Sequence, residues 1–460
     1  MPERTLNDWP APSSGAAGGS KGGHRSPGLR AYVFRPRAKG PPLSRRQFLN
    51  LKLPPSHRDA GRPGAAAALV DGLGERCVIG FGAGAVGGPL FSSLAKLGVG
   101  KIVWVDPDRN GPRSHETQAA APEDSGKLKA LVQGKRAFAS ALPHVEVISI
   151  AGFAQDLPLS LLRQADLFVV AGDNHALRVW AGCIAQCFGK RLVDCAVHGN
   201  LWCLFLRVYE LDRTDTACPG CGLSEKEWQS LPVRHGCDPE TQRVSSPTRA
   251  VGEQATRTLP QFSLTAADIA ATECLKCLLG LDAEVLLSEE LSYCLLTHKQ
   301  LRSELHRTKT CRCPHEKWET VDFPKRPEET SLAGVASHLG VERAQIQVRG
   351  ERPWISEALC DACQRRVAVR RFIRRYGEMV AKCRCGKPLL ALPRFGHSVL
   401  PATDLEASWE EPLSELGLEP SGEALGFSSG EGWTYCFFPG APRLPRARRT
   451  GQITTKRRTV

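Results

Sequence analysis

One stretch constrains the fold of this chain more than any other: residues 77–108, which read CVIGFGAGAVGGPLFSSLAKLGVGKIVWVDPD. It opens with an apolar run typical of a buried parallel strand. A helix over Pro89 to Leu97 and a strand over Lys101 to Val105 complete a strand–helix–strand unit. Between the first strand and the helix lie three glycines, Gly82, Gly84 and Gly87. Such glycines permit a tight turn and let the backbone approach a phosphate group.

An acidic residue, Asp106, directly follows the second strand. A carboxylate at this place can hydrogen-bond a ribose hydroxyl, while the amides at the helix start face a phosphate group. The stretch therefore predicts a nucleotide-binding unit. A buried strand–helix–strand unit without a ligand is the alternative.

The chain of 460 residues divides into a large α/β domain, which contains this stretch, and three further parts. Residues 1–63 are rich in Gly, Ser, Pro and Arg and are predicted to be disordered. Residues 64–325 alternate strands and helices, with Thr265 expected to cap the helix that continues to Leu279. Residues 328–440 carry a second cysteine set and form a separate small domain. Residues 441–460 form a basic, disordered tail.

The composition of the chain limits the classes of protein to which it can belong. No apolar run approaches the roughly 20 residues of a membrane-spanning helix, and the N-terminus lacks the apolar core of a signal peptide. We therefore expect a cytoplasmic protein, in which 18 cysteines favour metal ligands and buried thiols over disulfides. The net charge of +13 lies largely in the two ends and favours solubilising termini. Nucleic acid is a compatible partner, but no aromatic residues interleave the arginines of the C-terminal tail to support it.

The order of motifs resembles a known family. GAGAVG, LAKLGVGKIVWVDPD, GKLK, DLFVVAGDN, CPGC and CRC follow one another as in the ThiF/MoeB/HesA adenylyltransferases, prokaryotic relatives of ubiquitin-activating enzymes. The resemblance covers about Ala65 to Val321. It implies a Rossmann-like, mostly parallel sheet with flanking helices, a homodimer, and the use of ATP with magnesium. The implied reaction adenylates the C-terminal carboxylate of a ubiquitin-like or sulfur-carrier protein that ends in glycine.

Matched motif by motif, the resemblance assigns roles to single residues. The three glycines would cradle the phosphates and Asp106 would hold the ribose. Lys129 falls at the family's phosphate-binding lysine, with Lys127 as the rival. Asp173 falls at the acid that positions magnesium, because a carboxylate that attacks a polyanion needs cations nearby. A helix N-cap is the alternative role for Asp173. The same resemblance adds Asp108 and Asn174 to the nucleotide-binding residues.

The chain departs from the family's pattern after the ribose acid. Where the family places an Asn and an Arg, this sequence has Ser114 and Thr117. Arg109, Arg113 or an arginine of another chain would have to substitute, or adenylation is weakened or lost. The alternatives are thus a degenerate scaffold that only binds ATP, and an NAD-dependent oxidoreductase built on the same strand–helix–strand unit. Lys129, the Asp173-Asn174 pair and the split cysteine pairs favour the adenylyltransferase.

Two cysteine sets predict two zinc sites of four thiolates each. By the resemblance, the first zinc is structural and closes the end of the sheet. The second set resembles a zinc ribbon. The first comprises Cys218, Cys221, Cys311 and Cys313, and the second comprises Cys360, Cys363, Cys383 and Cys385.

One further cysteine, Cys237, lies in the loop after the first pair. In the family, a cysteine near this position can receive the activated carrier or take part in sulfur transfer. Neighbouring Arg234 and His235 would favour its thiolate. A loop cysteine without a role is the alternative.

Overall fold

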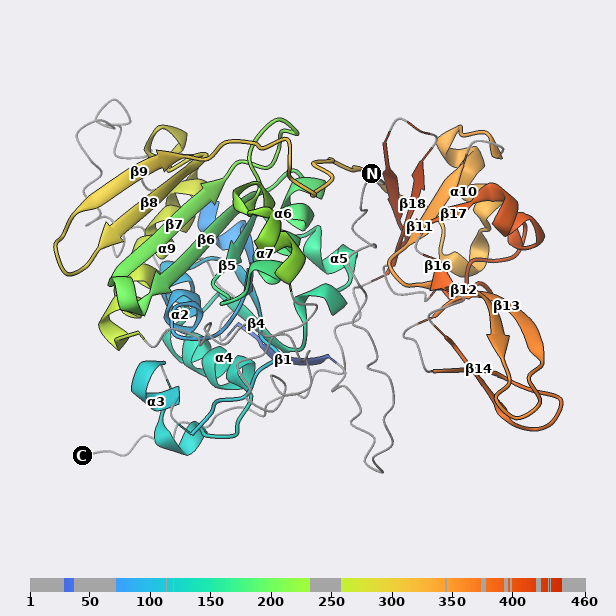
Figure 1. Ribbon diagram of the computed structural model, residues 1–460, viewed down its shortest axis with the longest axis horizontal. Helices are drawn as coiled ribbons and strands as arrows, with labels where there is room; N and C mark the ends of the chain where they lie inside the picture. Colours follow the sequence, from blue (N-terminus) through green and yellow to red (C-terminus); the bar gives the residue numbers. More distant parts are fainter. Residues whose placement is uncertain are drawn as a thin grey trace. The chain divides into compact units, whose positions relative to one another are not determined.

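The computed structural model describes residues 29–36, 72–112, 114–118, 120–231, 258–343, 346–373, 378–392, 396–397, 399–418, 423–428, 430 and 432–440. These residues form two compact units. The first contains residues 29–156 and 164–315, and the second contains residues 157–163 and 316–440. Figure 1 labels most of their helices and strands.

The first unit is built on a nine-stranded sheet with the order β1-β4-β3-β2-β5-β6-β7-β8-β9 (Figure 1). Its central strands, from β4 to β6, pair in parallel, whereas β7, β8 and β9 continue the sheet with antiparallel pairings. The predicted α/β fold with a mostly parallel sheet is confirmed. The strands are β1 (Arg30–Phe34), β2 (Cys77–Phe81), β3 (Lys101–Val105), β4 (Glu146–Ala151), β5 (Leu167–Val170), β6 (Arg191–His198), β7 (Cys203–Tyr209), β8 (Glu289–Cys294) and β9 (Gln300–Glu304).

Helices cover both faces of this sheet. On one face lie α2 (Gly87–Leu97), α4 (Lys129–Ser140) and α9 (Pro260–Leu279), and Phe91 of α2 stacks on Trp104 of β3 at 5.1 Å between ring centroids. On the other face, Trp180 of α6 (His175–Cys187) meets Phe81 of β2 edge-on at 5.4 Å. Because both faces are buried, the parallel strands read as continuous apolar runs in the sequence. Short helices α3 (Ser114–Thr117) and α7 (Glu225–Ser230) lie in the connections.

The N-terminal region contains a strand that the sequence analysis missed. Residues 30–34 form β1, which pairs antiparallel with β4 and buries Ala31 and Phe34. The prediction of disorder over residues 1–63 is therefore wrong for this segment. Most of the remaining residues of that region lie outside the described residues.

Two predicted boundaries also shift. Helix α9 begins at Pro260, a residue that suits the first helical position because it lacks an amide hydrogen. Thr265, predicted as its N-cap, lies inside the helix, where its hydroxyl donates to the carbonyl of Gln261 at 2.9 Å. The first unit ends at residue 315 rather than 325, and residues 157–163, including α5 (Leu159–Leu162), belong to the second unit.

The second unit contains two small sheets and the helix α10 (Leu332–Leu339). One sheet has the order β10-β19-β18-β11-β17, and the other has the order β13-β12-β15-β14, with β16 also paired to β12. The strands are β10 (Glu319–Asp322), β11 (Gln347–Gly350), β12 (Trp354–Leu359), β13 (Arg366–Phe372), β14 (Met379–Lys382), β15 (Pro388–Leu390), β16 (Gly396–His397), β17 (Leu400–Pro401), β18 (Ala424–Ser428) and β19 (Thr434–Phe437). Among the described residues of the whole chain, no helix is long and apolar enough to span a membrane.

Candidate functional site

The glycine turn between β2 and α2 is fixed by close backbone contacts. Gly82 has φ +92°, and a Cβ at this position would lie 2.9 Å from the backbone of Ala171. A Cβ at Gly87 would lie only 1.8 Å from the carbonyl oxygen of Gly82. A Cβ at Gly84, by contrast, meets no described atom within 4 Å. Gly82 and Gly87 are thus needed to close the turn, whereas the side of the turn at Gly84 is open to a ligand.

Asp106 ties this turn to the end of β3. Its carboxylate accepts hydrogen bonds from the amides of Ala83 at 2.6 Å and Asp108 at 2.7 Å. Burial raises the pKa of Asp106 to about 6, although the nearby Lys129 opposes this rise. Asp106, the predicted ribose acid, therefore lies at the glycine turn, as expected for a nucleotide-binding strand–helix–strand unit.

Next to Asp106, a short antiparallel ladder brings Lys129 to the site. The amide of Lys129 donates to the carbonyl of Asp108 at 2.9 Å, and its ammonium lies 3.1 Å from Oδ2 of the same aspartate. Both side chains are largely buried. The rival, Lys127, is half exposed and pairs with Asp124 at 3.0 Å. The geometry thus favours Lys129 over Lys127 as the cation of the site.

Asn110 lies two residues along the same ladder, where its amide donates to the carbonyl of Lys127 at 2.8 Å. The residue is 2% exposed, and neither Nδ2 nor Oδ1 of its side chain has a hydrogen-bond partner among the described residues. The sequence analysis missed this residue because an asparagine in a polar loop carries no signal of burial. An unpaired buried amide is costly, so it marks a place where a partner is missing.

The structure shows the surroundings of the residues that depart from the family pattern. Ser114, at the family's asparagine position, is buried and accepts a hydrogen bond from the amide of Gly111 at 2.9 Å. Thr117 ends α3. Arg109, a suggested substitute for the missing arginine, donates to the carbonyl of Gly126 at 2.7 Å. The other suggested substitute, Arg113, lies outside the described residues.

A second loop, between β5 and α6, carries Asp173 and Asn174. Asn174 caps α6, because its Oδ1 accepts from the amide of Leu177 at 2.7 Å. The helix cap considered for Asp173 is therefore made by its neighbour, and Asp173 itself is exposed.

Arg178, in the first turn of α6, holds the loop between β5 and α6 in place. Its guanidinium donates to the carbonyl of Gly172 at 2.5 Å and pairs with the buried Asp194 of β6. Burial lowers the pKa of Arg178 to about 10. The sequence analysis missed Arg178, because its partners, the carbonyl of Gly172 and the carboxylate of Asp194, are not evident from the sequence.

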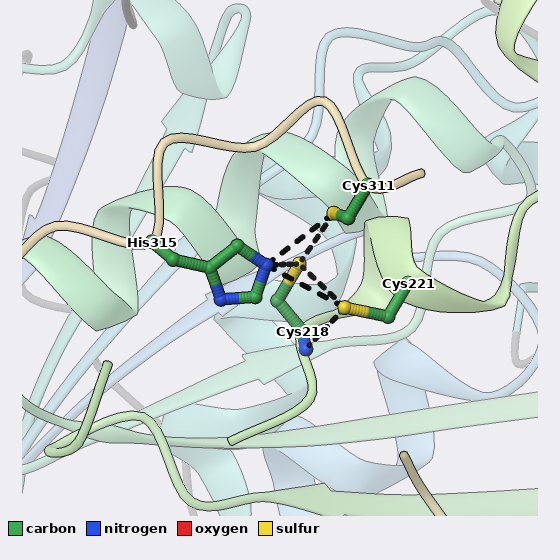
Figure 2. A group of neighbouring side chains, drawn as sticks. All are labelled: Cys218, Cys221, Cys311 and His315. Carbon is green, nitrogen blue, oxygen red and sulfur yellow. Dashed lines mark hydrogen bonds between the residues drawn. The ribbon is translucent and has the colours of Figure 1, made fainter. Parts of the chain in front are cut away.

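The first predicted metal site gathers in the structure with one different ligand (Figure 2). Three sulfurs, those of Cys218, Cys221 and Cys311, group with Nε2 of His315. The imidazole nitrogen lies 3.5, 3.5 and 3.3 Å from the three sulfurs, and Cys218 lies 3.9 and 3.6 Å from the other two. A tetrahedral zinc ion with Zn–S near 2.3 Å and Zn–N near 2.05 Å requires edges of about 3.8 Å and about 3.5 Å. The group therefore fits zinc.

The predicted ligand Cys313 lies outside this group of four. Its amide donates to the sulfur of Cys311 at 3.5 Å, and its own sulfur lies so close to Gly220 that a Cβ there would be only 2.6 Å away. Hydrogen bonding with Cys183 and Cys218 raises the pKa of the Cys313 thiol well above its usual value. The sequence analysis read the pair in CRC and overlooked the histidine four residues after Cys311.

The second cysteine set gathers as predicted. All four sulfurs lie within 4.8 Å of one another, with 3.5 Å between Cys360 and Cys385 and between Cys363 and Cys383. The two pairs lie in turns that follow β12 and β14. Four cysteine sulfurs at these separations fit one tetrahedral ion. Cys237, the remaining predicted site residue, lies outside the described residues.

Comparison with known proteins decides the family. The ThiF family matches residues 67–317, more than half of the chain. The chain belongs to the ThiF family. This family assignment agrees with the resemblance read from the motifs, and the match spans the glycine turn, Lys129, the Asp173 loop and the first metal group.

Among curated proteins, the chain is similar to the sulfur carrier protein adenylyltransferase of Thermus thermophilus, with 33% identity over 144 residues. This match covers 31% of the chain and 53% of the relative, so the chain spans about half the length of that protein. Among solved structures, it is similar to E. coli MccB with ATP, at 19% identity and a TM-score of 0.42, over 54% of this chain and 70% of that one. It is also similar to PaaA, at 14% identity and a TM-score of 0.40, over 58% and 79% of the two chains.

Proposed function

We propose that this protein uses ATP to adenylate the C-terminal carboxylate of a small carrier protein. One observation carries the proposal: the buried Lys129–Asp108 pair lies beside a glycine turn that Asp106 ties to the sheet, in a chain of the ThiF family. A cation held at the carboxyl ends of parallel strands is suited to a phosphate group that approaches the open side of Gly84. The name of the curated relative supports a sulfur-carrier protein as the substrate. The motif resemblance adds a ubiquitin-like protein that ends in glycine.

In the proposed reaction, a carboxylate oxygen attacks the α-phosphorus of ATP, and the bond to the bridging oxygen of pyrophosphate breaks. The glycine turn binds the phosphates, Asp106 orients the ribose, and Lys129 offsets the negative charge that builds up during attack. Asp173, exposed at the end of β5, would hold magnesium together with Asn174. Magnesium there would neutralise phosphate charge. Arg178 keeps this loop in place through the carbonyl of Gly172.

We also propose that both metal groups hold zinc. In the first unit, zinc would join the turn at Cys218 and Cys221 to the segment that carries Cys311 and His315, which are distant in sequence. Such a site has no open position when all four ligands bind, so its role is structural.

Three extensions of the proposal come from the family resemblance. Cys237 is proposed to attack the acyl-adenylate through its thiolate, forming a thioester and releasing AMP. A homodimer is proposed, in which the partner subunit would supply the arginine that Thr117 replaces. The protein is proposed to work in the cytoplasm.

A second candidate function is a scaffold that binds ATP without turnover. Two observations favour it: Thr117 stands where the family has its arginine, and Arg109 is engaged by the carbonyl of Gly126. The scaffold would retain the nucleotide contacts at the glycine turn and Lys129.

The decisive assay is exchange of labelled pyrophosphate into ATP by the full-length protein, with magnesium and a carrier identified by mass spectrometry of co-purifying small proteins. We expect exchange by the wild type, loss of exchange in Asp173→Ala, and exchange unchanged in Cys237→Ala. ATP binding without exchange would support the scaffold, and binding of NADH in place of ATP would support the oxidoreductase. A carrier conjugate that reductant releases from the wild type but not from Cys237→Ser would support the thioester.

A further inference from the structure

The zinc-ribbon segment of the second unit, residues 360–387, has an unusual charge. It contains nine basic and two acidic residues. Six of the basic side chains belong to exposed described residues: Arg365, Arg366, Arg370, Lys382, Arg384 and Lys387. A zinc ion with four thiolates would add two negative charges, which leaves the segment clearly positive.

Most of these side chains lack, in the described part of the chain, the ion pairs that several arginines elsewhere make. Outside the ribbon, Arg213, Arg302 and Arg312 are each paired with a carboxylate of the same unit. In the ribbon, Arg366 pairs with Glu357 at 3.7 Å. None of the other five has an ion-pair partner among the described residues. Unpaired charge concentrated in one small module indicates a binding surface for an anion more than a solubilising surface.

The fold of the ribbon gathers this charge on one module. Arg365 directly follows the first cysteine turn, and Arg384 and Lys387 belong to the second. Because the four sulfurs lie within 4.8 Å of one another, the two turns are held together.

Along β13, the alternation of the strand separates charge from core. Val367 and Val369 pack on the small apolar core of the ribbon. Arg366 and Arg370 alternate with them and are exposed. They are four residues apart, or about 13 Å along the strand. The basic surface thus extends from the cysteine turns along one strand.

We propose that this surface binds the phosphate backbone of a nucleic-acid duplex, independently of its sequence. Several guanidinium and ammonium groups on one module suit the repeated phosphates of a nucleic-acid backbone. The aromatic residues among the described residues of the ribbon strands, Trp354 and Phe372, are buried in the core. These described strands therefore offer no exposed ring on which the bases of a single strand could stack. This activity is separate from carrier adenylation and does not depend on it.

The test measures binding of the full-length protein to labelled DNA and RNA duplexes of 20 base pairs by fluorescence anisotropy at several salt concentrations. The variant replaces the four unpaired residues Arg365, Arg370, Arg384 and Lys387 with glutamine. The matched control removes four ion-paired charges elsewhere, by glutamine at Arg76, Arg213, Arg302 and Arg343. Both proteins have the same net charge and keep both basic ends of the chain.

We expect the ribbon variant to bind at least tenfold more weakly than the control. The slope of log affinity against log salt should fall by about 3 to 4, because each lost phosphate contact contributes about 0.9. The DNA and RNA arms show which duplex is preferred. A variant with lysine at the three arginines should retain binding, and zinc content should stay at the wild-type value in all variants.

Several results would overturn the proposal. One is no duplex binding by the wild type at low salt, and another is an equal loss in the control, which would assign binding to net charge. Tighter binding to a single strand would point to another mode of recognition. Competition by polyglutamate as effective as by duplex would assign the surface to an acidic protein.

Discussion

The ammonium of Lys129 lies 3.1 Å from Oδ2 of Asp108, with side chains only 4% and 15% exposed. Each charge would be costly to bury alone, so each holds the other in its place. Lys127 carries the same charge two residues earlier, but its side chain is 51% exposed. The two lysines can therefore be compared by mutation: Lys129 is buried at the proposed nucleotide site, and Lys127 lies on the surface.

We expect Lys129→Met to destabilise the protein by about 3 kcal/mol, because it leaves the carboxylate of Asp108 buried without its cation. Pyrophosphate exchange should fall more than about a hundredfold, since the phosphates lose a cation. Lys127→Met should cost less than about 1 kcal/mol, as for a surface ion pair, and should leave exchange nearly unchanged. Chemical denaturation and the exchange assay measure both effects.

The double variant Lys129→Met with Asp108→Asn separates stability from function. Because the unpaired charge is removed, we expect it to recover much of the lost stability but none of the exchange. Recovery of exchange in the double variant would mean that Lys129 acts only by neutralising Asp108. A larger loss of exchange in Lys127→Met than in Lys129→Met would reverse the assignment.

Asp106 should give the protein a distinctive pH dependence. Burial raises its pKa from 3.8 to about 6, so the folded state holds a proton that the unfolded state has already lost between these pH values. Its contribution to stability is therefore fully present below pH 3.8 and is lost as the pH rises through about 6. Relative to the wild type, Asp106→Asn should gain up to about 3 kcal/mol between pH 4 and pH 7. Urea unfolding of both proteins at several pH values tests this; a constant difference would contradict the raised pKa.

Asn110 allows a test that separates stability from binding. Because its buried side-chain amide has no hydrogen-bond partner among the described residues, Asn110→Leu should stabilise the free protein by about 1 kcal/mol. If the proposed nucleotide supplies the missing partner, the same variant should bind an ATP analogue at least about tenfold more weakly, a loss near 1.4 kcal/mol. Ser149→Ala is the control, since Ser149 is also buried, in the middle of β4, and its hydroxyl has no partner in the described part of the chain. A loss of stability in Asn110→Leu would indicate a structural role for the amide.

The sequence predicts the centre of the first unit well because physical constraints act locally there. Strands buried on both faces must be apolar throughout, and the glycine turn and Asp106 follow β2 and β3 directly in sequence. These features locate the proposed nucleotide site without knowledge of distant contacts. Lys129 was harder to choose over Lys127, because only the ladder with Asp108 shows which lysine is buried.

The features that the sequence did not predict depend on distant partners. β1 is a strand because it pairs with β4, more than 100 residues later, and nothing in its Pro- and Arg-rich surroundings indicates this. The assignment of residues 157–163 to the second unit likewise rests on long-range contacts, such as the amide of Leu159 with the carboxylate of Glu351 at 3.0 Å. Spacing along the chain does not distinguish His315 from Cys313 as a ligand; only the positions of their side chains do.

The metal groups give the last prediction. Elemental analysis of the reduced, full-length protein should find about two zinc ions per chain, one for each group. His315→Ala should lose the first ion or bind it at least tenfold more weakly, whereas Cys313→Ser should keep both, because its sulfur lies outside the group of four. Cobalt substitution gives a readout that does not depend on activity, since the visible spectrum of tetrahedral cobalt differs between three sulfurs with one nitrogen and four sulfurs. A spectrum that changes in Cys313→Ser but not in His315→Ala would restore the four-cysteine site expected from the sequence. Loss of the first zinc should also lower the stability of the first unit, because a structural ion contributes to folding directly.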